Sequence, residues 1–364
     1  MMKAEEILKK LVSFDTVGDK ENGKIMDWIG EFCVEAGFET EKIGNKKDGR
    51  VCLIARAGKS GKNGLIFIGH TDTVAVGGKW NTNPFELTQK ENDFFGLGAA
   101  DMKGGIAAML AAVGGLDSSE LSKGLELVFT YDEEKNFDGI KSVVEKHDLS
   151  ADCILIGEPT SLEPVVATKG VMVFRIDFVG KDAHGIHPEV GVNAIEMATD
   201  FIIELKEYFK MVEKNRNPIF DVPSATLNIA KINGGDVINK VPSACSLEFE
   251  SRIIDNKQGD KFKEDITALI EKNGYEAKVK ADFLLPVSMC RSKEFILTVE
   301  EVAKKKAIGV SYATEASFLP GSKNFVILGP GSIKVAHRAN EYTSGDSLNG
   351  AVGIYKELIN TFCA

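Results

Sequence analysis

The chain has 364 residues, of which 43% are hydrophobic and 27% charged, an ordinary globular composition with enough apolar residues for a large core. This length allows two domains. The formal net charge of -10 argues against a nucleic acid or an anionic membrane as partner, because there is no basic excess to neutralise phosphates.

The N-terminus and the cysteines bear on the cellular compartment. Residues 1–14 lack the basic start and unbroken apolar stretch of a signal peptide, and no segment is long and apolar enough to span a bilayer. We therefore expect a cytoplasmic protein. The six cysteines are scattered and form no CxxC pair, which predicts buried free thiols rather than disulfides or a thiolate zinc site.

The first half of the chain alternates predicted helices and strands. Apolar residues recur with helical spacing over 3–13 and 24–37, and the small, apolar stretch 102–116 suits a tightly packed helix. Apolar runs that end in turn residues predict four buried strands, over 51–58, 65–72, 125–134 and 153–160. This order predicts an α/β fold with a mostly parallel sheet sandwiched by helices. Ligands bind such sheets at the carboxyl ends of the strands.

The middle of the chain has a different pattern. Residues 171–180 alternate apolar and polar side chains, as a strand with one buried face does. The elements that follow give the order β-α-β-β-α-β of a ferredoxin-like, split βαβ fold, over 193–212, 226–234, 245–255, 261–274 and 277–286. The simplest account is an α+β domain over 168–285 inserted into a discontinuous main domain of 1–167 and 286–364.

Of the five histidines, His147 is expected to be solvated on the surface, whereas the others lie in distinctive places. His70 follows the strand LIFIG, where a lone histidine is more often a core residue than a metal ligand. Asp72 lies two positions further along and therefore on the same side of the strand. A carboxylate placed there can accept the second N–H of the imidazole and orient the ring as a metal ligand.

Further acidic residues follow glycines or strand ends. Asp101 precedes a Gly-rich helix start, where it is either a helix N-cap or a ligand, and the glycines match no phosphate-binding loop. Glu133 and Glu134 follow an apolar strand. Because adjacent strand carboxylates point to opposite sides, one could bind a metal while the other reaches a reacting water; a solvated loop is the alternative. Glu158 ends another strand.

His337, in a loop after an apolar run, completes this set. Singly, each residue is more often structural, but together they place two histidines and several carboxylates at the strand ends of one sheet. A mixed nitrogen and oxygen ligand set without thiolates suits catalytic zinc, manganese or cobalt. Two such metals need a bridging carboxylate and lie about 3.5–4 Å apart.

The residues that carry these features resemble the M20 metallopeptidase family. The likeness runs through essentially the whole chain and includes HTDTV at 70–74, GLGAADMKGG at 96–105, GEPTSLEPVVATKG at 157–170, TEASFLP at 314–320 and AHRANEY at 336–342. It implies a Zn-peptidase-like catalytic domain, an inserted lid and dimerisation domain that forms a homodimer, and two divalent metal ions, zinc with cobalt or manganese as substitutes. Glutamate rather than aspartate at position 158 favours a deacylase that acts on a small N-acyl amino acid.

Carried over residue by residue, the resemblance makes Asp101 the ligand that bridges the two metals. His70 and Glu158 would complete one metal position. Glu134 and His337 would complete the other.

The resemblance also implies roles for residues beside the ligands. Asp72 would orient His70, and Glu133 would be the general base. A cis peptide bond is expected between Asp101 and Met102.

In the inserted domain, His184 matches a lid histidine that reaches the site of a partner subunit and helps to hold the oxyanion. The family usually has GHSS here, whereas this chain has His184-Gly185-Ile186-His187, so His187 is a competing candidate. Asn239, Arg252 and the loop that contains Gly331 would contact substrate. For Arg252, a surface ion pair is the alternative.

Other reactions of the family share the same metal site, among them desuccinylation of succinyl-diaminopimelate, deacylation of other N-acyl amino acids and cleavage of dipeptides. A different class is a non-catalytic relative that binds amino acids or peptides. Such a relative is expected to lack the base or a ligand. This chain retains Glu133 and every ligand position, which favours an enzyme.

Overall fold

The computed structural model of the protein describes residues 2–44, 49–59, 63–319 and 324–364. The chain forms two compact units. The first comprises Met1–Val166, Met289–Ile308 and Thr314–Ala364, and the second comprises Ala167–Ser288 and Gly309–Ala313. Across the described residues, no helix combines the length and the apolar character that a membrane crossing requires.

A mixed sheet with a parallel centre forms the core of the first unit. Its strands run in the order β1-β2-β6-β3-β7-β17, followed by β8 and β15, with β16 paired to β8. The bounds are Glu39–Gly44 (β1), Val51–Ala57 (β2), Asn63–His70 (β3), Gly124–Thr130 (β6), Ala151–Ile156 (β7), Val165–Thr168 (β8), Ser288–Met289 (β15), Ile308–Val310 (β16) and Phe325–Ile327 (β17). The strands β6, β3, β7 and β17 are parallel and almost wholly buried, as strands covered on both faces are. The predicted α/β class with a mostly parallel central sheet is confirmed.

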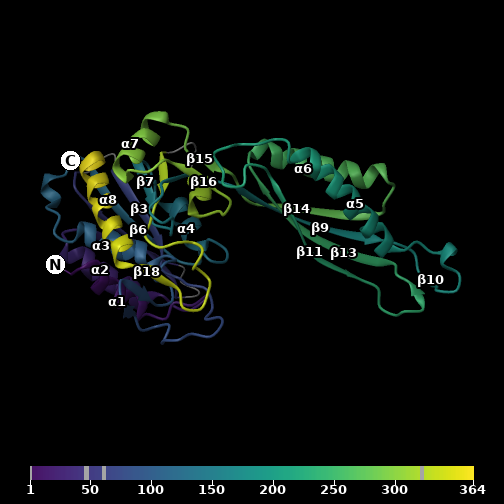
Figure 1. Cartoon of the computed structure of the whole chain (residues 1–364), viewed down its shortest axis with the longest axis horizontal. Helices are drawn as coiled ribbons and strands as arrows, with labels where there is room; N and C mark the ends of the chain where they lie inside the picture. The colour runs from purple at the N-terminus through teal and green to yellow at the C-terminus, as the bar shows by residue number, and fades with distance from the viewer. Residues whose placement is uncertain (1, 45–48, 60–62, 320–323) are drawn as a thin grey trace. The chain divides into compact units, whose positions relative to one another are not determined.

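Helices pack on this sheet and include the three predicted in the first half of the chain (Figure 1). They are α1 (Ala4–Val12), α2 (Gly23–Glu35), α3 (Lys103–Val113), α4 (Asp138–Lys146), α7 (Lys293–Ala303) and α8 (Gly345–Cys363). Helices α3 and α8 contact β3 and each other, and α2 and α4 contact β2. Every residue of α3 is buried. Its small residues allow this close packing, because a Cβ atom on Gly105 would lie 2.1 Å from the carbonyl oxygen of Gly157.

A small antiparallel sheet in the same unit joins distant parts of the chain. It consists of β4 (Thr88–Lys90), β5 (Asp93–Phe95) and β18 (Tyr342–Ser344), in the order β18-β5-β4. Tyr342 pairs with Phe95 in this sheet. The C-terminal segment 337–344 is thereby anchored beside the loop that precedes α3.

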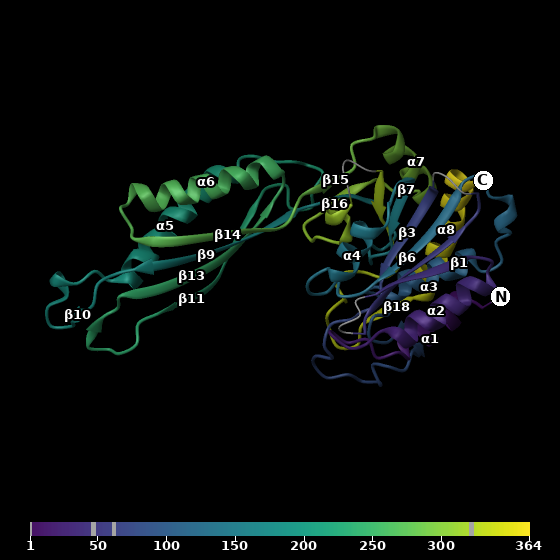
Figure 2. The same cartoon turned by 180° about the vertical axis from the view of Figure 1, so that it is seen from behind.

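The second unit is an antiparallel sheet of order β11-β13-β9-β14 with two helices. The bounds are Gly170–Val179 (β9), Ala194–Val212 (α5), Thr226–Gly234 (β11), Ala244–Ile253 (β13), Asn256–Lys272 (α6) and Ala277–Leu285 (β14). Both views show α5 and α6 on the same face of the sheet (Figure 1; Figure 2). The buried side chains of β9 and β13 alternate with more exposed ones and meet the helices in one apolar core, in which Phe174 stacks on Phe249.

Candidate metal centre

The carboxyl ends of three parallel strands place the first group of candidate residues. In the register of the sheet, His70 at the end of β3 pairs with Thr130 at the end of β6, and Ile68 pairs with Ile156 at the end of β7. Glu158 follows β7 by two residues. The strand ends therefore lie level, and residues that follow them meet at one edge of the sheet.

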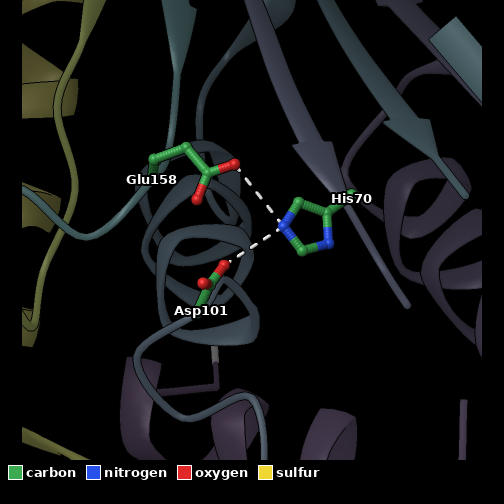
Figure 3. A group of neighbouring side chains, drawn as sticks. All are labelled: His70, Asp101 and Glu158. Atoms are coloured by element: carbon green, nitrogen blue, oxygen red, sulfur yellow. Dashed lines mark hydrogen bonds and ion pairs between the residues drawn. The ribbon is translucent and has the colours of Figure 1, made fainter. Parts of the chain in front are cut away.

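His70 is fully buried, and its two ring nitrogens face different groups. Nε2 lies 3.2 Å from Oδ1 of Asp101 and 3.5 Å from Oε1 of Glu158, and Figure 3 shows both carboxylates on this side of the ring. Nδ1 lies 3.1 Å from the backbone carbonyl oxygen of Asp72 and 3.5 Å from its carboxylate Oδ1. We call His70, Asp101 and Glu158 the first trio.

Asp101 also belongs to a second trio, with Glu134 and His337. Its other oxygen, Oδ2, lies 3.4 Å from Nε2 of His337, which is 2.9 Å from Oε2 of Glu134. Within each trio, the potential ligand atoms all lie within 4.8 Å of one another. The side chain of His337 is 52% exposed, whereas His70 is buried, so the second trio is the one that opens to solvent.

The backbone around Asp101 excludes one of the two interpretations that the sequence left open, the helix N-cap. Helix α3 begins at Lys103, and its N-cap position is Met102, so Asp101 is not the cap. The peptide bond between Asp101 and Met102 is cis, which confirms that expectation.

Glu133 and Glu134 lie in a turn rather than in a strand, which corrects the expectation that they point to opposite sides. Strand β6 ends at Thr130, and Asp132 has a positive φ of 63°. A buried ion pair of 3.0 Å between Oδ1 of Asp132 and Nη1 of Arg50 holds this turn. As a result both glutamates face the centre, and Oε2 of Glu133 lies 3.9 Å from Nε2 of His70.

The electrostatics of the cluster favour bound cations. Burial and the neighbouring carboxylates raise the pKa of Glu158 to about 8, and they raise the pKa of Glu133 well above its ordinary value. Burial opposes ionisation of Asp101, but hydrogen bonds from His337 and His70 hold its pKa below the ordinary value. The same contacts with Asp101 and Glu134 raise the pKa of His337 to about 10. Burial would lower the pKa of His70, yet the surrounding acids raise it well above its ordinary value.

The residues present fit a pair of divalent metal ions. Oε1 of Glu134 is buried and finds no hydrogen-bond partner among the described residues. Such oxygens are costly to bury unless a cation or donor satisfies them. The two trios supply two imidazoles and three carboxylates, with one carboxylate common to both. This nitrogen and oxygen donor set is typical of catalytic transition-metal sites.

Two buried glutamates near the centre were not identified from the sequence. Glu341 accepts hydrogen bonds from the backbone N–H groups of Gly98, Ala100 and Asp101. Glu315 accepts a hydrogen bond from the Thr130 hydroxyl. Glu315 lies in TEASFLP and Glu341 in AHRANEY, two stretches that resemble the family. Their place in these stretches was the signal from which a role near the site could have been inferred.

His147 is only partly exposed and contacts other side chains, which corrects the expectation of a solvated surface residue. Its Nε2 lies 2.7 Å from Oε1 of the buried Glu126, and the side chain is 18% exposed. Nη2 of Arg56 donates to its Nδ1. Glu126 lies four residues before the end of β6, so this cluster is away from the metal centre.

The second unit holds four of the candidate residues, His184, His187, Asn239 and Arg252. In a short hairpin, β10 (Ala183–His184) pairs with β12 (Lys240–Val241), and the Gly185 N–H donates to the carbonyl of Asn239. His184 and Asn239 are therefore neighbours at one tip of this unit. Arg252 lies on β13, and its Nε is 3.4 Å from Oε1 of Glu250, so the ion pair that was the alternative is present.

The hydrogen bonds of the two hairpin histidines differ. Nδ1 of His184 accepts a hydrogen bond from the Ile186 N–H, which in the neutral ring leaves the proton on Nε2. Nδ1 of His187 instead pairs with Oε1 of Glu189 at 3.2 Å.

Gly331 lies in the first unit and approaches the Asp101 loop closely. Its φ is 80°, and a Cβ atom there would lie 3.0 Å from Cβ of Ala100. Its N–H donates to Oγ of Ser347, and its carbonyl accepts from the Ser161 N–H. Glycine is required here by both the backbone conformation and the space.

Solved structures with the same fold include peptidases. A tripeptidase from Staphylococcus aureus superposes with a TM-score of 0.81 at 22% identity, covering 99% of this chain and 98% of that one. A structure from Bacillus subtilis, described as a dinuclear metal binding peptidase from the M20 family, has a TM-score of 0.74 at 15% identity over 99% of this chain and 97% of its own. These likenesses establish the fold.

The sequence comparisons establish the family. The acetylornithine deacetylase of Buchnera aphidicola is 33% identical to this chain, across 98% of this chain and 97% of its own length. The sequence pattern of Peptidase family M20/M25/M40 matches residues 66–361, which contain both trios. The chain therefore belongs to Peptidase family M20/M25/M40 and is a metal-dependent amide hydrolase of the deacylase or peptidase type.

Proposed function

We propose that this chain is a di-metal deacylase that hydrolyses N-acetylornithine to ornithine and acetate. The observation that carries the proposal is the double trio around Asp101, in a chain that is 33% identical to an acetylornithine deacetylase over almost its whole length. The substrate is a small molecule with one amide bond to be hydrolysed.

The first trio would hold one metal and the second trio the other, with zinc as the proposed metal and cobalt or manganese as substitutes. The separate contacts of the Asp101 oxygens support a bridging role. Oδ1 faces His70 and Oδ2 faces His337. When bound, two such metals acidify water and polarise the carbonyl that is attacked.

Glu133 is the proposed general base. It belongs to neither trio, yet its Oε2 lies 3.9 Å from Nε2 of His70, at the centre. Its raised pKa, caused by burial first, suits a carboxylate that takes the proton of the attacking water and later returns it to the leaving nitrogen. Asp72 would orient His70, through its carboxylate and its backbone carbonyl.

His184 is the proposed donor to the oxyanion of the tetrahedral intermediate. With Nδ1 engaged by the Ile186 N–H, the Nε2–H is the group that it presents to a substrate. His187 is the weaker candidate, because its Nδ1 is engaged by Glu189. Asn239, the neighbour of His184 in the hairpin, would contact substrate, as would Arg252 and Gly331.

We also propose that the second unit joins two copies of the chain and presents His184 to the site of the partner subunit. Apolar side chains are exposed around the hairpin, among them Ile186, Val190 and Ile238. Exposed apolar residues gathered in this way are typical of an interaction surface.

A panel of substrates tests the reaction. The zinc-loaded enzyme is assayed with N-acetylornithine, N-acetylcitrulline, N-acetyllysine, N-succinyl-diaminopimelate and dipeptides, and the released acetate, succinate or amino acid is measured. We expect the highest kcat/KM for N-acetylornithine, and we expect the Glu133→Gln variant to turn over this substrate about 10²- to 10⁴-fold more slowly than the native enzyme. A higher kcat/KM for succinate release or for dipeptide cleavage would assign another substrate to the same metal centre.

A further inference from the structure

A single buried carboxylate holds the loop that presents Asp101. Oε1 of Glu341 accepts hydrogen bonds of 2.8 Å from the Ala100 N–H and 2.9 Å from the Asp101 N–H. Its Oε2 accepts one of 3.1 Å from the Gly98 N–H. Glu341 is 1% exposed, so these three donors have little access to water as a substitute partner.

The loop itself leaves little room for another arrangement. Gly98 has a φ of 76°, and a Cβ atom there would lie 2.8 Å from Cγ2 of Thr73. Ala99 and Ala100 are completely buried. The three N–H groups converge on one point because of this tight turn, and a carboxylate is the side chain with enough lone pairs to accept all of them.

Glu341 is itself held firmly. Its backbone carbonyl accepts a hydrogen bond from the Gly96 N–H, and the next residue, Tyr342, pairs with Phe95 in the small sheet. His337 lies four residues earlier in the same segment. One segment therefore carries a residue of the second trio and also the carboxylate that holds the loop of Asp101.

We propose that Glu341 is a positioning residue that fixes the Asp101 backbone so that one oxygen of its carboxylate faces each metal position, and that it thereby sets the affinity of both positions. Glu341 acts through the backbone of Asp101, not through the Asp101 carboxylate. The inference rests on the proposed function of Asp101 as the shared ligand.

Substitutions at this position separate the contribution of each hydrogen bond. Glu341→Ala removes all three acceptors. Glu341→Gln keeps the shape, and with its amide oxygen at the place of Oε1 it retains the bonds from Ala100 and Asp101 while losing the bond from Gly98. The alanine variant is therefore expected to weaken metal binding more than the glutamine variant.

Glu126 provides the matched control. It is a fully buried glutamate of β6 that accepts hydrogen bonds from Arg56, Asn63 and His147. It lies four residues before Thr130, about 13 Å along the strand from the metal centre. Glu126→Ala should destabilise the fold and leave metal affinity unchanged.

The experiment measures zinc affinity of the full-length chain by competition with a chromophoric chelator, together with thermal unfolding. Visible absorption of the cobalt(II)-loaded protein reports ligand geometry. Relative to the native chain, we expect Glu341→Ala to weaken both zinc positions by about 10- to 100-fold and Glu341→Gln by less. The cobalt spectrum should change in Glu341→Ala and stay native in Glu126→Ala.

Native zinc affinity and a native cobalt spectrum in either folded Glu341 variant would overturn the proposal. So would an equal loss of affinity in Glu126→Ala at a similar decrease in Tm, because the effect would then be general destabilisation. If Glu341→Ala does not fold, the zinc affinity and cobalt spectrum of Glu341→Gln still test the proposal. A native chain that binds two zinc ions but does not hydrolyse N-acetylornithine would contradict the proposed substrate and leave this inference standing.

Discussion

Oδ2 of Asp72 accepts a hydrogen bond of 3.2 Å from the backbone N–H of Glu134. The same carboxylate has Oδ1 3.5 Å from Nδ1 of His70. Asp72 therefore contacts a residue of the first trio and the turn that carries a residue of the second. Its role is wider than the orientation of one imidazole.

From these contacts we predict that Asp72→Ala weakens zinc binding at both positions, by about 10- to 100-fold. The substitution removes the acid beside His70 and also the acceptor of the Glu134 N–H. Asp72→Asn, whose amide oxygen can still accept from Glu134, should affect the second position less. Chelator competition measures both affinities, and a loss confined to one position in Asp72→Ala would limit Asp72 to the orientation of His70.

Glu133→Gln should retain two zinc ions and lose turnover by about 10²- to 10⁴-fold, because the amide cannot take the proton of water. The adjacent Glu134→Gln is the matched control. Its side chain contacts His337 in the second trio, so this variant should lose metal from that position. Metal analysis and the kcat of the zinc-loaded protein are compared between the two variants. Near-native turnover in Glu133→Gln would show that Glu133 is not the general base.

Asp101→Ala is expected to deplete both metal positions, because its two oxygens face different trios. Glu158→Ala and His337→Ala should each deplete one position, since each belongs to a single trio. Metal content after dialysis distinguishes these patterns. Retention of two full equivalents in Asp101→Ala would exclude the bridge.

Much of the candidate metal centre could be predicted because its residues follow strand ends. His70 and Glu158 end apolar runs whose parallel pairing brings them level, so the periodicity of the chain locates them. The turn at Glu133 and Glu134 could not be predicted in this way. The apolar run continues through Tyr131, and the strand stops earlier because Asp132 turns back to pair with Arg50, a contact between distant segments.

Contacts between distant segments also explain the other differences. Glu341 and His147 sit in polar stretches that resemble solvated loops. Glu341 is buried and His147 is partly buried, each against a partner that no local pattern identifies. The partner of Glu341 is the Asp101 loop, far away in the sequence, and the partner of His147 is Glu126 on a central strand. Burial of a single polar residue has no periodicity, so the sequence alone could not distinguish these residues from surface ones.

Mixed variants test whether His184 serves the partner subunit. His184→Ala and Glu133→Gln should each be nearly inactive. If His184 acts across a symmetric dimer, subunit exchange between the two variants yields heterodimers with one complete site, and an equimolar mixture regains about a quarter of native activity. His187→Ala should stay active, because Glu189 engages that ring. A mixture that stays inactive although subunits exchange would place His184 in the site of its own chain.

The buried carboxyl of Glu315 makes the stability of the metal-free chain depend on pH. Glu315 is completely buried, and its Oε2 has no hydrogen-bond partner among the described residues. Burial raises the pKa of this carboxyl from 4.5 to about 7. Since the folded state then binds the proton more tightly than the unfolded state, this group contributes stability below pH 4.5 that is lost as the pH rises toward about 7.

Glu315→Gln removes this ionisation and retains an acceptor for the Thr130 hydroxyl. Relative to the native metal-free chain, the free energy of unfolding of the variant should therefore increase between about pH 5 and pH 7, by on the order of 2–3 kcal/mol, and stay constant above that range. Denaturant unfolding of both metal-free proteins across this range measures the difference, in which the other titrating groups cancel. A difference that does not change with pH would mean that Glu315 keeps an ordinary pKa in the folded chain.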